Sequence, residues 1–122
     1  MKKILIAEDD KFLSNAYRIK LTKLGYEVAI VSDGEQVMQY LKDNTIPDLL
    51  LLDLIMPIKD GFDTLKEIKS QDKLKKIPVI VASNLGQGED VKKAKELGAI
   101  DYIVKSDLSL QELAEKIHTY IQ

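Results

Sequence analysis

The chain has 122 residues, of which 45% are hydrophobic and 31% charged, and this fits one globular domain over residues 1–122. Its 18 basic and 20 acidic residues give a net charge of -2, which provides no overall field to attract nucleic acid or an anionic membrane as a direct partner. The absence of cysteine excludes disulfides, thiolate metal sites and a cysteine nucleophile, and it is typical of the reducing cytoplasm.

The first half of the chain alternates short apolar runs with amphipathic segments. The run 4–7 predicts a strand buried on both faces, and the acids that follow it exclude a signal peptide. The next segment predicts a helix that ends at Gly25 and turns four side chains inward: Leu13, Tyr17, Leu21 and Leu24. A second strand is predicted over 28–31, and Ser32 or Asp33 is expected to cap the helix after it. The inward residues of that helix are Val37, Met38 and Leu41.

The second half repeats this alternation. Residues 49–52 are the most apolar segment of the chain and predict a third strand, which ends at Asp53. A helix is predicted around 64–70, with two inward residues, Leu65 and Ile68. Three further elements are expected: a strand over 79–82, a helix over 89–97 and a strand over 100–104. The last helix is capped by Ser109, and its inward residues are Leu110, Leu113, Ala114 and Ile117.

Five apolar strands, each followed by a helix, predict the fold class. Such an alternation implies right-handed crossovers and a parallel sheet covered on both faces, which is a doubly wound α/β fold. The spacing suits the flavodoxin-like strand order 2-1-3-4-5 with five flanking helices, in which the winding reverses between strands one and three. Ligands of such sheets bind beside that reversal, at the carboxyl ends of the strands. The residues that follow each strand are therefore the candidates for a functional site.

Polar side chains follow four of the five predicted strands. They are Glu8, Asp9 and Asp10 after strand one, Asp53 after strand three, Ser83 after strand four and Lys105 after strand five. Taken singly, each acid is explained as a helix cap or a solvated loop residue. Taken together, carboxylates on adjacent strands would repel one another unless a cation lay among them. Ligands that are all oxygen select a hard cation, and a site completed by water suits Mg²⁺.

A hydroxyl and an ammonium at the same edge extend this chemistry to phosphate. Ser83 would offer a hydrogen bond to a phosphoryl oxygen, and Lys105 would offer a compact positive charge. An aspartate nucleophile, a metal, an ammonium and a hydroxyl are what phosphoryl transfer to a carboxylate requires, because that reaction depends mostly on positioning and charge neutralisation.

Four motifs occur in order along the chain. They are Ile-Leu-Ile-Ala-Glu-Asp-Asp at 4–10, Asp-Leu-Ile-Met-Pro with Asp-Gly over 53–61, Pro-Val-Ile-Val-Ala-Ser at 78–83 and Gly-Ala-Ile-Asp-Tyr-Ile-Val-Lys at 98–105. With these motifs the chain resembles the response-regulator receiver domains of two-component signalling, in particular the chemotaxis-regulator type. The resemblance covers the whole chain, and four motifs in this order at these spacings are highly specific.

The resemblance implies the composition of the acidic site. Asp53 would be the phosphoacceptor, and Mg²⁺ would be bound directly by Asp9 and Asp53 and by the backbone carbonyl of Ile55. Glu8 would act on the metal through water. Asp10 is better explained as the cap of the first helix than as a ligand.

The resemblance also implies a switch and its partners. Ser83 matches the family's switch hydroxyl, Tyr102 its switch aromatic, whose ring moves inward, and Lys105 the lysine that pairs with the phosphoryl oxygens. Partners would then read the surface formed by helix four, strand five and helix five. The resemblance implies a histidine kinase or phosphotransfer protein as the phosphodonor and a downstream target protein as the partner that receives the signal. It is also compatible with a transient homodimer. Such a domain catalyses only its own phosphorylation and dephosphorylation and is not otherwise an enzyme.

Three other functions are weighed against this one. A phosphatase of the haloacid-dehalogenase type needs a second acid two residues after its aspartate nucleophile, where this chain has Ile55. A flavin carrier of the same fold needs a phosphate loop rich in glycine and hydroxyls after strand one, where this chain is acidic. A receiver-like docking module that works without phosphorylation would have little reason to keep the acids, the hydroxyl and the lysine together.

Two features of the loops are expected from local chemistry. Ser106 stands where the family usually has a proline after a cis peptide bond. Because a cis bond before a residue other than proline costs about 2.5 to 4 kcal/mol, we expect this bond to be trans. The pair Asp60 and Gly61 is interpreted as turn chemistry, in which glycine allows a positive φ.

Two apolar residues predict a long-lived phosphorylated state. Ile55 and Leu85 lie two residues past Asp53 and Ser83, and the resemblance implies that these positions are near the path of the water that would hydrolyse the acyl phosphate. We therefore expect slow self-dephosphorylation, to be measured as the decay of the phosphorylated protein in Mg²⁺ buffer after removal of the donor. A half-life of seconds would contradict this expectation.

Overall fold

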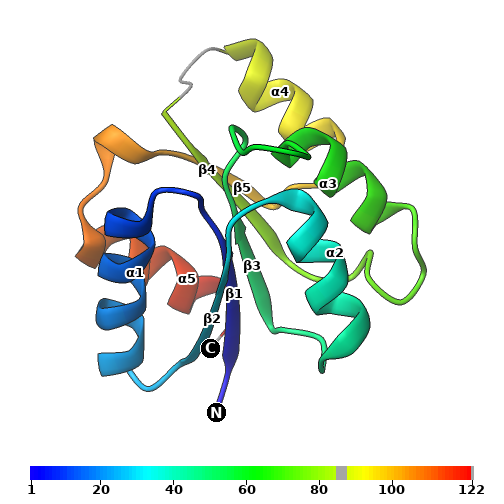
Figure 1. The fold of residues 1–122 in the computed structure, drawn as a ribbon. Coiled ribbons are helices and arrows are strands. Elements are labelled where there is room, and N and C mark those ends of the chain that lie inside the picture. The colour runs from blue at the N-terminus through cyan, green and yellow to red at the C-terminus, as the bar shows by residue number, and fades with distance from the viewer. Residues whose placement is uncertain (85–87, 122) are drawn as a thin grey trace.

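Strands and helices alternate along the whole chain (Figure 1). The computed structural model describes residues 1–84 and 88–121. The strands are β1 (Lys3–Ala7), β2 (Glu27–Val31), β3 (Leu49–Leu52), β4 (Val79–Ser83) and β5 (Asp101–Val104). The α-helices are α1 (Lys11–Lys23), α2 (Gly34–Asp43), α3 (Gly61–Lys69), α4 (Gly88–Glu96) and α5 (Leu110–Ile121). One turn of 3-10 helix, η1 (Lys105–Asp107), follows β5.

The strands form one parallel sheet in the order β2-β1-β3-β4-β5, which confirms the predicted doubly wound α/β fold. Helices α1 and α5 cover one face, and α2, α3 and α4 cover the other (Figure 1). In the register of β1 and β3, Ala7 pairs with Leu52. These two strands therefore end side by side, and the residues that follow them, Glu8 and Asp53, start from neighbouring positions.

The central strands are apolar on both faces because both faces are covered. All four residues of β3 are buried, and they alternate between two cores. Leu50 and Leu52 face the core under α2 and α3, whereas Leu49 and Leu51 face the core under α1 and α5. Packing on both sides therefore fixes the strand that directly precedes Asp53.

Two helix ends differ from the expected inward stripes. Leu24, expected to face inward, is 51% exposed, because α1 ends at Lys23 and the chain turns away at Gly25, whose φ is 95°. Leu110 is 38% exposed because it is the first residue of α5. Its neighbour Ser109 caps the helix as expected, with its hydroxyl oxygen accepting from the Glu112 N–H at 3.1 Å.

Helix α3 begins at Gly61, three residues before the expected start. The reason is Asp60, whose carboxylate accepts a hydrogen bond from the Asp63 N–H at 2.9 Å and caps the helix. No peptide bond among the described residues is cis, so the bond before Ser106 is trans, as expected. None of the helices in the described ranges has the length and apolar character needed to cross a membrane.

Candidate functional site

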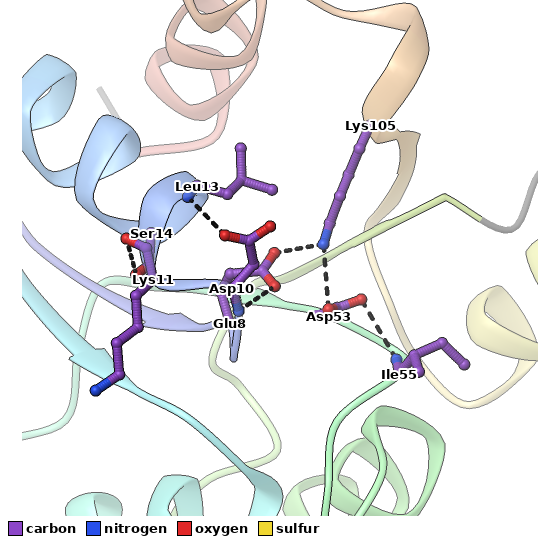
Figure 2. A network of polar contacts seen from close by, with 8 residues as sticks. All are labelled: Glu8, Asp10, Lys11, Leu13, Ser14, Asp53, Ile55 and Lys105. Carbon is purple, nitrogen blue, oxygen red and sulfur yellow. Dashed lines mark hydrogen bonds and ion pairs between the residues drawn. The ribbon is translucent and has the colours of Figure 1, made fainter.

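Side chains from three strand ends meet at the carboxyl edge of the sheet (Figure 2). The Lys105 ammonium, which follows β5, donates a hydrogen bond to Oε1 of Glu8 after β1. The same nitrogen lies 3.1 Å from Oδ2 of Asp53 after β3. All three side chains are largely buried, so this is an ion-paired group inside the protein and not a surface contact.

Asp9 completes an acidic cluster with Glu8 and Asp53. Each of the three offers a carboxylate oxygen, and these oxygens all lie within 4.8 Å of one another. Asp9 is exposed, so the cluster opens to solvent on that side. Asp10 turns away to cap α1, because its Oδ1 accepts a hydrogen bond from the Leu13 N–H at 3.1 Å, as expected from the sequence.

The charges of this group are not balanced. Burial raises the pKa of Glu8 to about 7, the hydrogen bond from Lys105 opposes that rise, and the charge of Asp53 adds to it. For Lys105, burial alone would lower the pKa, but the hydrogen bond to Glu8 and the charge of Asp53 raise it above its ordinary value. The lysine is therefore protonated at neutral pH. It compensates one of three potential carboxylate charges, which leaves two for a further cation.

The donor set of the cluster fits a hard divalent cation. Three carboxylates within 4.8 Å provide only oxygen ligands, and their uncompensated charge matches that of Mg²⁺. Glu8, Asp9 and Asp53 are thus the residues that could hold such an ion. The pKa of Glu8 is raised first by burial and then by the charge of Asp53, and a cation at this place would offset both effects.

Ser83 and Tyr102 lie on the neighbouring strands β4 and β5. Ser83 is fully buried at the end of β4, and Tyr102 is half-buried on β5. Burial raises the pKa of the Tyr102 hydroxyl, and hydrogen bonding with Ser83 acts against that rise. The two residues expected to form the switch therefore interact directly.

Ile55 lies beside Asp53 through its backbone. Its N–H donates to Oδ1 of Asp53 at 3.3 Å, while its side chain is 63% exposed and points away from the acids (Figure 2). This places the backbone of Ile55 next to the carboxylate, as a backbone ligand would require. Leu85, the other residue of the predicted apolar pair, lies outside the described residues.

One residue near the site was missed as a site residue by the sequence analysis. Tyr17 of α1 was assigned only to the inward face of its helix, and it is indeed buried. Its hydroxyl also interacts electrostatically with the site, because burial and then the charges of Glu8, Asp53 and Asp10 raise its pKa above the usual range. No local signal could have shown this, since a tyrosine in an apolar stripe is indistinguishable from any other core residue.

Comparison with known proteins gives the family. Residues 4–118 match the family described as the response regulator receiver domain. The chain belongs to this family. This membership confirms the resemblance to receiver domains of two-component signalling that was inferred from the four sequence motifs.

Several relatives support this assignment. The transcriptional regulatory protein CpxR of Klebsiella pneumoniae is 38% identical over 100% of this chain and 50% of its own length. The solved phosphorylated cyanobacterial phytochrome response regulator RcpA is 36% identical, with a TM-score of 0.85 over 97% of this receiver and 89% of that chain. The Mn²⁺-bound response regulator Rcp1 is 34% identical, with a TM-score of 0.83 over 98% and 91%. The receiver spans about half the length of CpxR.

The raised pKa of Glu8 predicts a pH dependence of stability in the metal-free receiver. A folded-state pKa of about 7 against an ordinary 4.5 means that the folded protein favours the protonated acid. The contribution of Glu8 to the free energy of unfolding should therefore be fully present below pH 4.5. It should be lost as pH rises to 7, which lowers the free energy of unfolding by up to about 3 kcal/mol. Urea unfolding in EDTA, followed by circular dichroism, measures this. Glu8→Gln should flatten the dependence of the free energy of unfolding on pH. Identical pH dependences for the wild type and Glu8→Gln would contradict the raised pKa of Glu8.

Proposed function

We propose that this receiver accepts a phosphoryl group on Asp53 with Mg²⁺ bound among Glu8, Asp9 and Asp53. The observation that carries the proposal is the Lys105 ammonium in contact with both Glu8 and Asp53, beside three carboxylates within 4.8 Å of one another. The backbone carbonyl of Ile55 would be a further ligand, and Glu8 would act through water. The relatives whose names record a phosphorylated form and a Mn²⁺-bound form support this proposal.

Asp53 would act as the nucleophile. One of its carboxylate oxygens forms a bond to phosphorus while the bond from phosphorus to the donor's nitrogen or oxygen breaks and its electron pair leaves with the donor. The backbone N–H of Ile55 holds the other oxygen, Oδ1, and so orients the carboxylate. A bound Mg²⁺ would supply neutralisation of the charge on the phosphoryl oxygens.

Lys105 and Ser83 would stabilise the product. Phosphorylation adds up to about two negative charges at Asp53. The Lys105 ammonium, held in place by Glu8, would contact a phosphoryl oxygen, and the buried hydroxyl of Ser83 would donate a hydrogen bond to another. Both groups come from the carboxyl edge of the sheet, where Asp53 also lies.

The output would be a change in the surface formed by α4, β5 and α5. Ser83 interacts with Tyr102, so a move of the hydroxyl toward a phosphoryl group would release the ring to adopt a new position. Helix α4 has one buried residue, Ala94, so little packing would oppose its displacement. A downstream target protein would bind this surface. The same role is compatible with a transient homodimer.

The proposed setting is a two-component relay. A histidine kinase or a phosphotransfer protein would be the phosphodonor, and the receiver, one domain over residues 1–122, would catalyse only its own phosphorylation and dephosphorylation. We place the exchange in the cytoplasm, since a chain without cysteine needs no oxidising compartment.

Asp53→Asn tests the acceptor directly. Incubation of the wild-type protein with Mg²⁺ and acetyl phosphate should add one phosphoryl group, seen as a mass increase of the intact protein, because the carboxylate is the nucleophile. Asp53→Asn should show no adduct, since an amide oxygen does not form a stable acyl phosphate under these conditions. EDTA should abolish the adduct on the wild type.

The matched control is Asp10→Asn. Asp10 caps α1, and asparagine is an equally good cap, so this variant should be phosphorylated like the wild type. An adduct on Asp53→Asn, or none on the wild type, would refute the proposed acceptor.

A further inference from the structure

The loop between β3 and α3 carries part of the proposed metal site and is closed at its base by Gly61. It begins at Asp53 and continues with Leu54 and Ile55. The Gly61 N–H donates to the carbonyl oxygen of Leu54 at 2.9 Å, so the first residue of α3 is hydrogen-bonded to the residue that follows Asp53 in the loop. The position of Ile55 beside Asp53 therefore depends on how closely α3 approaches the end of β3.

Gly61 lies too close to the backbone of Asp53 and Leu54 for any side chain. A Cβ built on Gly61 would overlap the carbonyl oxygen of Asp53 and lie 2.7 Å from the Cα of Leu54. Both contacts are with backbone, which cannot swing aside as a flexible side chain can. A methyl group here would have to move the backbone on either side of the phosphoacceptor or push α3 away from it.

This close approach corrects the turn interpretation of Gly61. Among the described glycines, positive φ occurs at Gly25 and Gly98, and Gly61 is not one of them. Its backbone is compatible with any residue, so it is the space beside Asp53 that requires glycine.

The rest of the loop is held in one conformation. Ile58 has a φ of 69°, which is strained for a β-branched residue, and the Lys59 N–H donates to the carbonyl of Pro57 at 2.7 Å. At its far end, the buried hydroxyl of Thr64 donates to the carbonyl of Asp60 at 2.7 Å. A strained turn persists only where its surroundings fix it, so the contact of Gly61 with the strand end is one of the constraints that fix it.

We propose that Gly61 is a positioning residue for phosphoryl acceptance. Its missing side chain lets the start of α3 rest on the backbone of Asp53, and this sets the position of the acceptor carboxylate and of the Ile55 carbonyl. The inference rests on the proposed function of Asp53, and it assigns to Gly61 no contact with the phosphoryl group. It acts through the backbone of its two neighbours in space.

Gly61→Ala tests this role with two measurements. The rate constant for phosphorylation at saturating Mg²⁺ and acetyl phosphate should fall about 10- to 100-fold, as expected for displacement of a reacting group by a fraction of an ångström to an ångström. The dissociation constant for Mg²⁺ alone, measured by calorimetry without any donor, should rise several-fold. A purely structural role would change neither quantity per folded molecule.

Gly98→Ala is the matched control. Gly98 has a φ of 108°, so alanine is strained there and lowers stability, yet the position has no contact with the acidic site. Its phosphorylation rate and its Mg²⁺ affinity, corrected for the folded fraction seen by circular dichroism, should stay within about threefold of the wild type.

A second variant decides the matter if Gly61→Ala does not fold. Asp60 caps α3 by accepting a hydrogen bond from the Asp63 N–H at 2.9 Å. Asp60→Ala loosens the start of α3 and should weaken Mg²⁺ binding and phosphorylation, whereas the control Gly98→Ala should leave both unchanged per folded molecule.

The outcomes separate the two proposals. A folded Gly61→Ala with wild-type rate and Mg²⁺ affinity would overturn the positioning role, as would an Asp60→Ala variant whose rate and Mg²⁺ affinity equal those of Gly98→Ala. A wild-type protein that takes no phosphoryl group would instead contradict the proposed function. In that case the Mg²⁺ titrations still judge Gly61, because equal affinities of Gly61→Ala and Gly98→Ala would overturn its role.

Discussion

The ion-paired contact of Lys105 with Glu8 and Asp53 constrains everything else at this site. Buried carboxylates are costly unless they are paired, and here one ammonium serves two of them. The pairing is incomplete, because Asp9 adds a third acid and burial still raises the pKa of Glu8. The site thus carries more acidic groups than its one ammonium can pair, and in the proposed function this excess of negative charge would attract a cation and, through the cation, phosphate.

The packed apolar sheet holds these charged groups close together. Strands β1 and β3 are packed on both faces and end in register, so Glu8 and Asp53 are delivered side by side with little freedom to move apart. Lys105 comes from β5, beyond β4, and it reaches back across the strand ends to close the group. The core therefore determines the distance between charges that would otherwise separate.

Much of this was predictable because it is encoded in local pattern and topology. Apolar runs followed by acids, a serine and a lysine place those residues at one edge of a parallel sheet, and the structure places Glu8, Asp9, Asp53 and Lys105 there. Periodicity could not show where a helix ends, so Leu24 and Leu110 were wrongly turned inward. Contacts made only in three dimensions, such as the field at Tyr17 and the backbone that excludes a Cβ at Gly61, leave no mark in the sequence.

The central claim is that three carboxylates share one cation, and Asp9 tests it best because it is exposed and outside the contacts of Lys105. Calorimetric titration of Mg²⁺ into the wild type should show one site, and Asp9→Asn should weaken it about tenfold or more by removing one ligand charge. Asp10→Asn should bind as the wild type does. Equal affinities for the wild type and Asp9→Asn would contradict the account.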